Sequence, residues 1–184
     1  MGDREIVIGE NTKEDNGLKY MTSFCQSNEI FRSYSDALCS DDYTEIAGIY
    51  GKRIAERSEK VRNEIKNIGV ETTPLTATDC LPLSHKDDIN DKVIALKSEI
   101  MRPEYRRADC QIYLVTGGFG ASANSRGSAV FCKNLYTGKD TRWERRDVLG
   151  VIKPESLPGW AKQREEEIRT EKKRPKEKDS PGVR

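Results

Sequence analysis

The hydrophobic period of this chain changes once, near Ala108, and that change constrains the fold more than any other feature. Before it, apolar residues recur at three- and four-residue steps, as they do on one face of a helix. After it, apolar and polar residues alternate, as along half-buried strands. The sequence therefore predicts an α+β fold, with N-terminal helices that include one long helix, then a C-terminal antiparallel β-meander with a covering helix and a charged tail.

The clearest predicted helix spans Asp41 to Ile68. Ser40 suits the N-cap, and Gly69 suits the position after the helix end. One narrow apolar stripe runs along it, formed by Tyr43, Ile46, Tyr50, Ile54, Val61, Ile65 and Ile68. Such a stripe packs either on its own domain or on a second copy, and the second case would make a homodimer through the long helix. Weaker helical patterns cover residues 18–38, where the pattern is broken, and residues 88–101.

The second half of the chain predicts an antiparallel sheet. The expected strands are Cys110–Thr116, Ser128–Asn134, Asp140–Arg146 and, more briefly, Val148–Ile152. The preceding helix at 88–101 would cover one face of this sheet. Three regions follow from these patterns: a helical region over 1–70, an α+β domain with the antiparallel sheet over 71–160, and a charged tail over 161–184, either helical or disordered.

The net charge of +1 conceals an uneven distribution of charge along the chain. Residues 1–100 carry a net charge of −6, residues 101–153 carry +5, and residues 161–184 carry +3. An acidic first half and a basic second half predict two surfaces with different partners. Hydrophobic residues make up only 35% of the chain, and no apolar run reaches the length of a membrane span. We therefore expect no membrane partner.

Cysteine and histidine give no pattern of a metal site. The five cysteines are far apart, none forms a paired ligand spacing, and His85 is the only histidine. Nucleophile and metalloprotease motifs are missing as well. We therefore expect no catalytic residues, no metal and no cofactor. Reduced cysteines, with no signal peptide at the N-terminus, predict a cytoplasmic protein of the host bacterial cell.

The most unusual segment is the glycine-rich loop from Val115 to Gly127. Gly117, Gly118, Phe119 and Arg126 are the candidate binding residues in it, because exposed backbone N–H groups and one cation could contact a phosphate. The loop lacks the P-loop signature and leads into a strand, so nucleotide binding lacks its usual context. The alternative is a flexible hairpin loop with glycines at positive φ.

A basic hairpin follows the loop. Its cations are candidate binding residues for nucleic acid or a partner protein: Lys133, Lys139, Arg142, Arg145 and Arg146, with Trp143 between them. Lysine and arginine side chains favour nucleic acid because they release counterions from the phosphate backbone. The alternative is a solvated sheet face, on which these cations make local ion pairs with Asp140, Glu144 and Asp147.

Four short strings carry a resemblance to a known group of proteins. They are Leu114–Ala121, Arg126–Cys132, Asn134–Lys139 and Arg142–Arg145, within a similar region that runs from about Leu75 to Trp160. This region resembles a little-characterised family of small proteins from phages, plasmids and conjugative elements of gut Gram-positive bacteria. The resemblance implies an anti-CRISPR protein, an inhibitor that binds the type II effector nuclease, its guide RNA or its DNA. It supplies no site residues.

The leading hypothesis is thus a non-enzymatic inhibitor of a host CRISPR effector nuclease, which binds the effector with its guide RNA, and/or DNA. The basic hairpin would meet nucleic acid or an acidic groove, and the acidic half would imitate nucleic acid toward a basic channel. One alternative is a DNA- or RNA-binding accessory protein of a mobile element. A guide-RNA-degrading nuclease is the third hypothesis.

Overall fold

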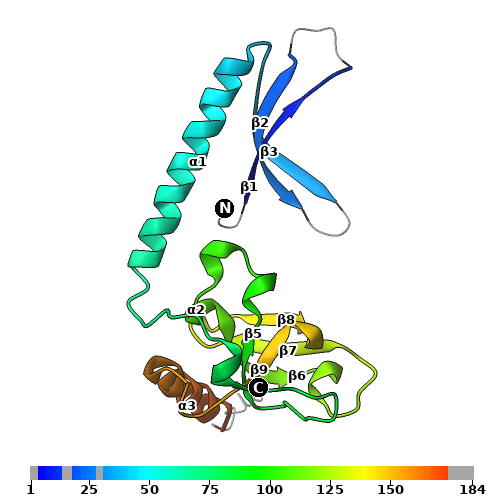
Figure 1. The fold of residues 1–184 in the computed structure, drawn as a ribbon, viewed down its shortest axis with the longest axis vertical. Coiled ribbons are helices and arrows are strands. Elements are labelled where there is room, and N and C mark those ends of the chain that lie inside the picture. The colour runs from blue at the N-terminus through cyan, green and yellow to red at the C-terminus, as the bar shows by residue number, and fades with distance from the viewer. Residues whose placement is uncertain (1–3, 14–17, 28–30, 174–184) are drawn as a thin grey trace, which may run out of the picture. The chain divides into compact units, whose positions relative to one another are not determined.

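The computed structural model describes residues 4–13, 18–27 and 31–173, and the chain divides into two compact units (Figure 1). Unit 1 is Met1–Gly69 and unit 2 is Val70–Arg184. Their sequences carry net charges of −3 and +4, so the contrast in sign persists at the observed boundary. Part of the acidic charge predicted for the first half belongs to the start of unit 2.

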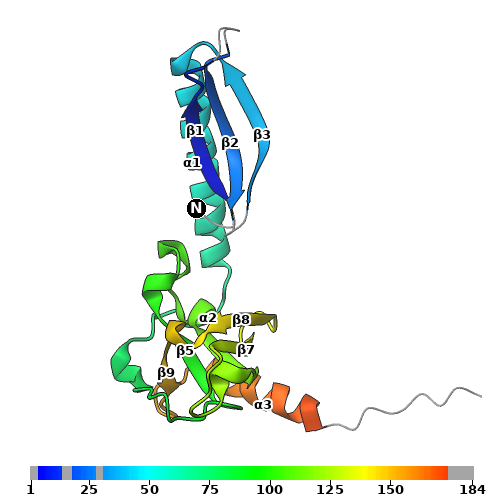
Figure 2. The same cartoon turned by 90° about the vertical axis from the view of Figure 1, so that its right-hand side faces the viewer.

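Unit 1 is a three-stranded antiparallel sheet followed by one helix. Its elements are β1 (Glu5–Glu10), β2 (Tyr20–Ser27), β3 (Arg32–Ser40) and α1 (Tyr43–Lys66), with β2 in the centre of the sheet. α1 runs along one face of the sheet (Figure 2). An extra residue in β3 shifts the register, because Thr22 lies opposite Leu38 whereas Phe24 lies opposite Ser35. Asp36 has a φ of 52° at this bulge.

The prediction of an N-terminal region built of helices was wrong, because a three-stranded sheet precedes α1 and the fold as a whole is mostly β. The residues predicted as a broken helix, 18–38, supply β2 and most of β3. The apolar steps of three and four residues there arise across two strands rather than along one helix. Threonine, serine, cysteine and aromatic residues dominate β2, and such residues favour a pleated, half-buried surface over a helix interior.

α1 is the predicted long helix, capped by a different residue. The Asp42 side chain, rather than Ser40, accepts hydrogen bonds from the backbone N–H of Thr44 (2.7 Å) and of Glu45 (3.4 Å). The Ser40 hydroxyl instead donates to the Glu45 carboxylate at 2.6 Å. Tyr43 meets Tyr20 of β2 edge to face, with ring centroids 5.3 Å apart. The apolar stripe therefore packs on the sheet of its own unit.

Unit 2 contains a six-stranded antiparallel sheet in the order β4-β9-β5-β6-β7-β8. The strands are β4 (Cys80–Leu81), β5 (Val93–Leu96), β6 (Ile112–Gly117), β7 (Ala129–Asn134), β8 (Asp140–Glu144) and β9 (Val148–Ile152). The helices are α2 (Ala108–Gln111) and α3 (Gly159–Lys173). Short 3₁₀ turns are η1 (Ala77–Asp79), η2 (Ser98–Ile100), η3 (Pro103–Tyr105), η4 (Phe119–Ala121) and η5 (Arg145–Asp147). No described helix is long and apolar enough to cross a membrane.

Two predicted features of unit 2 are corrected. The sheet is not a simple meander, because β9 turns away from β8 and pairs with β5 and β4, with Ile94 opposite Val151 and Cys80 opposite Ile152. The covering helix predicted at 88–101 is wrong as well, since β5 occupies its centre. All four residues of β5 are buried, so the strand shows no alternation and resembles a helix segment in the sequence.

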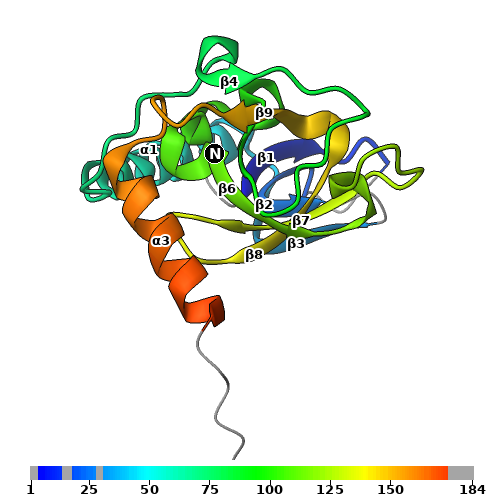
Figure 3. The ribbon, with the colours of Figure 1, turned by 90° about the horizontal axis from the view of Figure 1, so that it is seen from below.

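The sheet of unit 2 is buried on both faces at its central strand β5. Alternate residues of β5 enter two separate apolar clusters, Val93 and Ala95 in the first and Ile94 and Leu96 in the second. α3 closes the first cluster with Ala161 and Ile168, and Figure 3 shows it beside the sheet. α3 therefore includes the start of the predicted charged tail, and residues 174–184 of that tail lie outside the described residues.

A buried glutamine forms hydrogen bonds with two backbone segments at the edge of this core. Gln111 is fully enclosed, and its side chain accepts from the N–H of Leu75 (2.9 Å) and donates to the carbonyls of Leu75 (3.3 Å) and Leu96 (3.1 Å). Each bond satisfies a polar backbone group of a buried residue. Gln111 thus ties the first residues of unit 2 to the end of β5.

Candidate functional site

The glycine-rich loop between β6 and β7 is closely packed. Gly118 has a φ of 103°, and a Cβ added to it would lie 2.4 Å from the Ala129 carbonyl oxygen. At Gly120 an added Cβ would lie 2.2 Å from the Ser128 carbonyl oxygen. Gly117 has a φ of 151°, which residues with a side chain rarely adopt, although an added Cβ would meet no atom within 4 Å. Gly118 and Gly120 therefore let the loop fold back against the start of β7, and that contact holds its shape.

A second segment, residues 83–89, braces the loop from the side. The Asn124 N–H donates to the His85 carbonyl at 2.9 Å, and His85 Nε2 lies 3.0 Å from the Ser125 carbonyl oxygen. The Ile89 N–H donates to the Ala121 carbonyl at 2.9 Å. The two segments thus form one support, although 40 residues separate His85 from Ser125 in the sequence.

The Arg145 side chain clamps the glycine-rich loop to segment 83–89. Its guanidinium donates to the carbonyls of Gly120 (2.9 Å), Ser84 (2.9 Å) and Asp87 (3.0 Å). Arginine suits this role because its donors form a rigid planar fork. Because three carbonyls already accept its hydrogen bonds, the Arg145 guanidinium is less available to a ligand than the sequence alone suggests. Its role in the site is to position the loop.

A basic pocket of about 580 Å³ lies between these segments and the turn η5. Its charged and titratable lining consists of His85, Lys97, Arg126, Glu144, Arg145 and Arg146. Four of these side chains carry a positive charge at neutral pH, and Glu144 carries the negative one. The pocket therefore brings together three of the predicted binding residues, Arg126, Arg145 and Arg146, and adds Lys97 to them.

The exposed cations of the basic pocket are Arg126 and Arg146. The Arg146 side chain is 86% exposed, and its Nε lies 4.0 Å from the Asp147 carboxylate, at the outer limit of an ion pair. Glu144 accepts a hydrogen bond from Ser128, which lowers the pKa of its carboxyl, and the charges of Arg142 and Arg146 lower that pKa further. Glu144 thus stays ionised and offsets part of the positive charge.

The remaining predicted cations are distributed more widely. Lys133 lies 2.9 Å from the Asp140 carboxylate, and Arg142 lies 2.7 Å from that of Glu144, as the solvated-face alternative anticipates. Lys139 lines a different cavity. Phe119 stands at the rim of the glycine loop and is 80% exposed. The nine predicted residues therefore do not form one patch.

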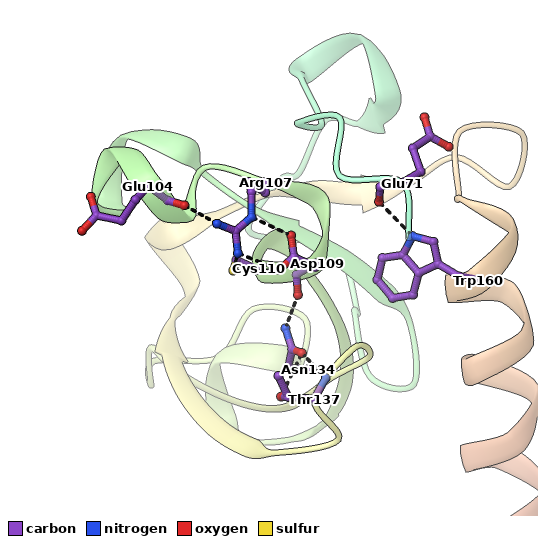
Figure 4. A network of polar contacts seen from close by, with 8 residues as sticks. All are labelled: Glu71, Glu104, Arg107, Asp109, Cys110, Asn134, Thr137 and Trp160. Carbon is purple, nitrogen blue, oxygen red and sulfur yellow. Dashed lines mark hydrogen bonds and ion pairs between the residues drawn. The ribbon is translucent and has the colours of Figure 1, made fainter. Parts of the chain in front are cut away.

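The cavity next to Lys139 is apolar and has a volume of about 400 Å³, with Tyr105, Tyr113 and Trp143 in its lining. A polar network lies beside it (Figure 4). Asp109 is 3% exposed and pairs with Arg107 at 3.0 Å, and its carbonyl accepts from Asn134 at 2.9 Å. The network anchors α2 to the turn after β7.

The cysteine of this network is not a nucleophile at neutral pH. Burial, with the adjacent Asp109 carboxylate adding to it, raises the pKa of the Cys110 thiol to about 12. A thiol must lose its proton to react or to bind a metal, and this environment opposes that loss. Within the described parts of the chain, no three histidine, cysteine, aspartate or glutamate side chains gather closely enough to hold a metal ion.

Sequence reasoning missed two members of the basic pocket, His85 and Lys97. Neither lies near the glycine loop or the hairpin in the sequence, and neither belongs to a motif. Only the path of segment 83–89 and the pairing of β5 with β9 bring them to Arg126 and Arg146. No local signal could have identified them.

Comparisons with known proteins identify no relative. No family model matches the chain, no curated protein matches it, and no solved structure matches it. The resemblance to the family from mobile elements therefore stays a prediction that depends on the four strings quoted above.

Proposed function

We propose that this protein is a non-enzymatic nucleic-acid-binding protein and that its basic pocket receives backbone phosphate. The observation that carries the proposal is the pocket itself, where Lys97, Arg126 and Arg146 surround a cavity whose backbone is held by Arg145. Cations that converge on one concave site favour a polyanion, because each phosphate contact releases condensed counterions. A preformed support also lowers the entropy cost of binding.

The anti-CRISPR hypothesis is one specific form of this proposal. In that form the phosphates belong to the guide RNA or to the DNA of a type II effector complex, in the cytoplasm of the host cell, and the protein inhibits the nuclease by occupying their place. The accessory-protein alternative differs only in its target, because binding to naked nucleic acid would then be the function. The same pocket serves both.

Salt dependence tests the binding itself. Fluorescence anisotropy with labelled DNA and RNA should show an affinity that falls steeply with salt concentration. Arg126→Ala with Arg146→Ala should lower the slope of log K against log salt by about 2, roughly 0.9 for each phosphate that the variant no longer neutralises. The matched control is Lys52→Ala with Lys66→Ala, two exposed lysines of α1. An unchanged slope in the arginine variant would refute the phosphate site.

A cleavage assay separates the two targets. Purified type II effectors should cut DNA more slowly in the presence of the protein if the anti-CRISPR form is correct. Full cleavage at a large molar excess, across several effectors, rejects that form and leaves the accessory-protein form. Intact guide RNA after incubation with magnesium or manganese supports the non-enzymatic assignment, whereas fragments of the RNA contradict it.

The proposal also includes a homodimer through α1. α1 already packs on its own sheet, yet Tyr43 and Ile65 at its two ends stay exposed. Sedimentation velocity of the full chain gives the mass directly. A monomer at concentrations of about 100 μM would reject a dimer of functional strength, since a Kd above this value corresponds to a weak association.

A further inference from the structure

Two aromatic side chains, one in the glycine-rich loop and one in the strand that follows it, are exposed. Phe119 in η4 is 80% exposed and Phe131 in β7 is 49% exposed. Exposing so much of a large apolar side chain to water costs free energy, although single exposed rings are common. The pair is informative because of its position. Phe119 begins the turn whose Gly120 carbonyl accepts from Arg145, and Phe131 lies in β7, which pairs with the strand that carries Glu144 of the pocket.

The strand register places the two phenylalanines close together in the chain fold. Phe131 lies opposite Gly117 of β6, two residues before Phe119. A Cβ added to Gly118 would lie 3.1 Å from the Phe131 backbone nitrogen, so the loop turns directly over this part of β7. The two rings therefore rise from adjacent backbone segments that glycine-rich packing holds in place.

The side of the sheet that carries Phe131 can be identified from burial. Val130 and Cys132 are buried in the second apolar cluster, so Phe131 and Lys133 project from the opposite side. Lys133 lies opposite Leu114, which is buried in the first cluster together with α3. The face of the sheet that carries the first apolar cluster is thus buried at β6 and exposed at β7, where Phe131 lies.

Cations accompany Phe131 on this open face. Arg142 of β8 lies directly opposite Phe131 in the register, and Lys133 lies two residues further along β7. The Arg142 side chain is 58% exposed and pairs with Glu144, itself part of the pocket lining. The stem of Phe119 rests on Gly127, which also lines the pocket, since an added Cβ there would lie 2.5 Å from Phe119 Cβ. Both phenylalanines are thus linked to the pocket through neighbouring residues, Phe119 through Gly127, and Phe131 through Arg142 and Glu144.

We propose that Phe119 and Phe131 are stacking positions for two unpaired bases, so that the ligand is a single-stranded nucleic acid whose backbone phosphates occupy the basic pocket. This inference rests on the proposed function and narrows its ligand class. In a duplex the faces of the bases are already stacked on one another, and an aromatic side chain reaches them only where the strand is unpaired. Exposed rings beside a cationic groove are the arrangement that binds single strands.

The test compares single-stranded and double-stranded probes of the same sequence. The full chain is titrated into a fluorescein-labelled oligonucleotide of about 12 nucleotides, a length that fits one binding module, and into its duplex. Phe119→Ala and Phe131→Ala should each weaken single-strand binding at least about fivefold, since one stacked base contributes that much or more. Duplex binding and its salt dependence should not change.

Two further variants separate stacking from simple apolar contact and from misfolding. Phe119→Leu with Phe131→Leu keeps the apolar bulk and removes the aromatic faces, so it should bind single strands nearly as weakly as the double alanine variant. Tyr34→Ala removes an exposed aromatic side chain of unit 1 and should have no effect. Tryptophan fluorescence checks the fold, because Trp143 and Trp160 both lie in unit 2.

The possible outcomes distinguish the inference from the proposal beneath it. Single-strand preference in the wild type, lost in both phenylalanine variants, supports stacking. Equal affinity for both probes, or wild-type affinity in the phenylalanine variants, overturns stacking while the arginine variants still report on phosphate binding. Failure of the wild-type protein to bind either probe overturns the proposed function, and the inference with it.

Discussion

Units 1 and 2 share an architecture of antiparallel strands and one longer helix, yet they differ in how they bury apolar surface. In the described residues of unit 1, the buried apolar side chains are Cys25, Ile46 and Val61. In the same unit Phe31, Tyr34 and Leu38 are about half exposed. Unit 2 encloses its sheet between two clusters that include both faces of β5.

The comparison shows where a precise site can be supported. A binding pocket needs side chains held by a rigid surrounding shell, and only a well-packed unit supplies one. The basic pocket lies in unit 2, on loops fixed by the Arg145 clamp and by close glycine contacts. Unit 1 buries less, so its stability depends on fewer contacts and each buried group counts for more.

Buried polar groups give the sharpest test of this difference. Gln111→Ala should lower the free energy of unfolding of unit 2 by about 4 kcal/mol, because it leaves a cavity and deprives Leu75 and Leu96 of three hydrogen bonds. Urea unfolding of the full chain, followed by tryptophan fluorescence, measures this change in the free energy of unfolding. A loss below about 1 kcal/mol would show that the enclosed amide is not a structural tie.

The matched variant in unit 1 is Ser23→Ala. The Ser23 hydroxyl is buried and finds no partner among the described residues, so its removal should be neutral or stabilise unit 1 by up to about 1 kcal/mol. Hydrogen exchange of the amides of α1 reports on this unit separately. Destabilisation by Ser23→Ala would mean that both units use their buried polar groups alike.

Glycine substitutions give the second test. Gly120→Ala should destabilise unit 2 by about 3 kcal/mol, because the new Cβ meets the Ser128 carbonyl oxygen and the backbone must shift. Gly48→Ala, in α1, meets no atom within 4 Å and should stabilise unit 1 by about 1 kcal/mol through helix propensity. Similar effects in both units would contradict the tight packing of the glycine loop.

Alkaline pH gives the third test. Burial raises the pKa of the Cys110 thiol from 9.0 to about 12 and that of Cys80 to about 11, so the folded state prefers both thiols neutral. Their contribution to stability is complete below about pH 9 and is lost as the pH rises toward the folded-state pKa values. Unfolding free energies of unit 2, measured by tryptophan fluorescence, should therefore fall above about pH 9.

Two cysteine variants check the origin of that alkaline loss. Cys110→Ala should remove part of the loss of stability above about pH 9. Cys80 and the buried Tyr113 hydroxyl, whose pKa burial raises to about 12, should account for the rest of that loss. Cys39 in unit 1 is exposed, and Cys39→Ala should leave the pH profile unchanged. A profile that is equally steep without Cys110 would place the titrating group elsewhere.

The part of the fold that sequence reasoning predicted correctly is the part where one signal dominates. α1 has twenty-four residues of helical period, with aspartates at its start and a glycine beyond its end, so its existence was predictable. β2 and β3 of unit 1 were missed because a short strand carries few residues, and the three or four apolar matches in each also fit a helix. β5 was missed because burial on both faces removes alternation.

The residues of the candidate site were likewise predictable only in part. Arg126, Arg145 and Arg146 were predictable because loop and hairpin are neighbours along the chain. Their different roles were not, since only the fold shows Arg145 held by three carbonyls and Arg146 in solvent. His85 and Lys97 enter through long-range contacts that no local pattern encodes.

The position of β9 also has a consequence for synthesis of the chain. β9 is the last strand of the described residues to leave the ribosome, yet it lies between β4 and β5, which precede it by more than 50 residues. The sheet of unit 2 cannot close until residue 152 has emerged, and such long-range pairing is slow to form. Unit 1, with strands and helix contiguous in sequence, can fold while β9 is still in the exit tunnel, so the nascent chain exposes an open sheet edge during this interval.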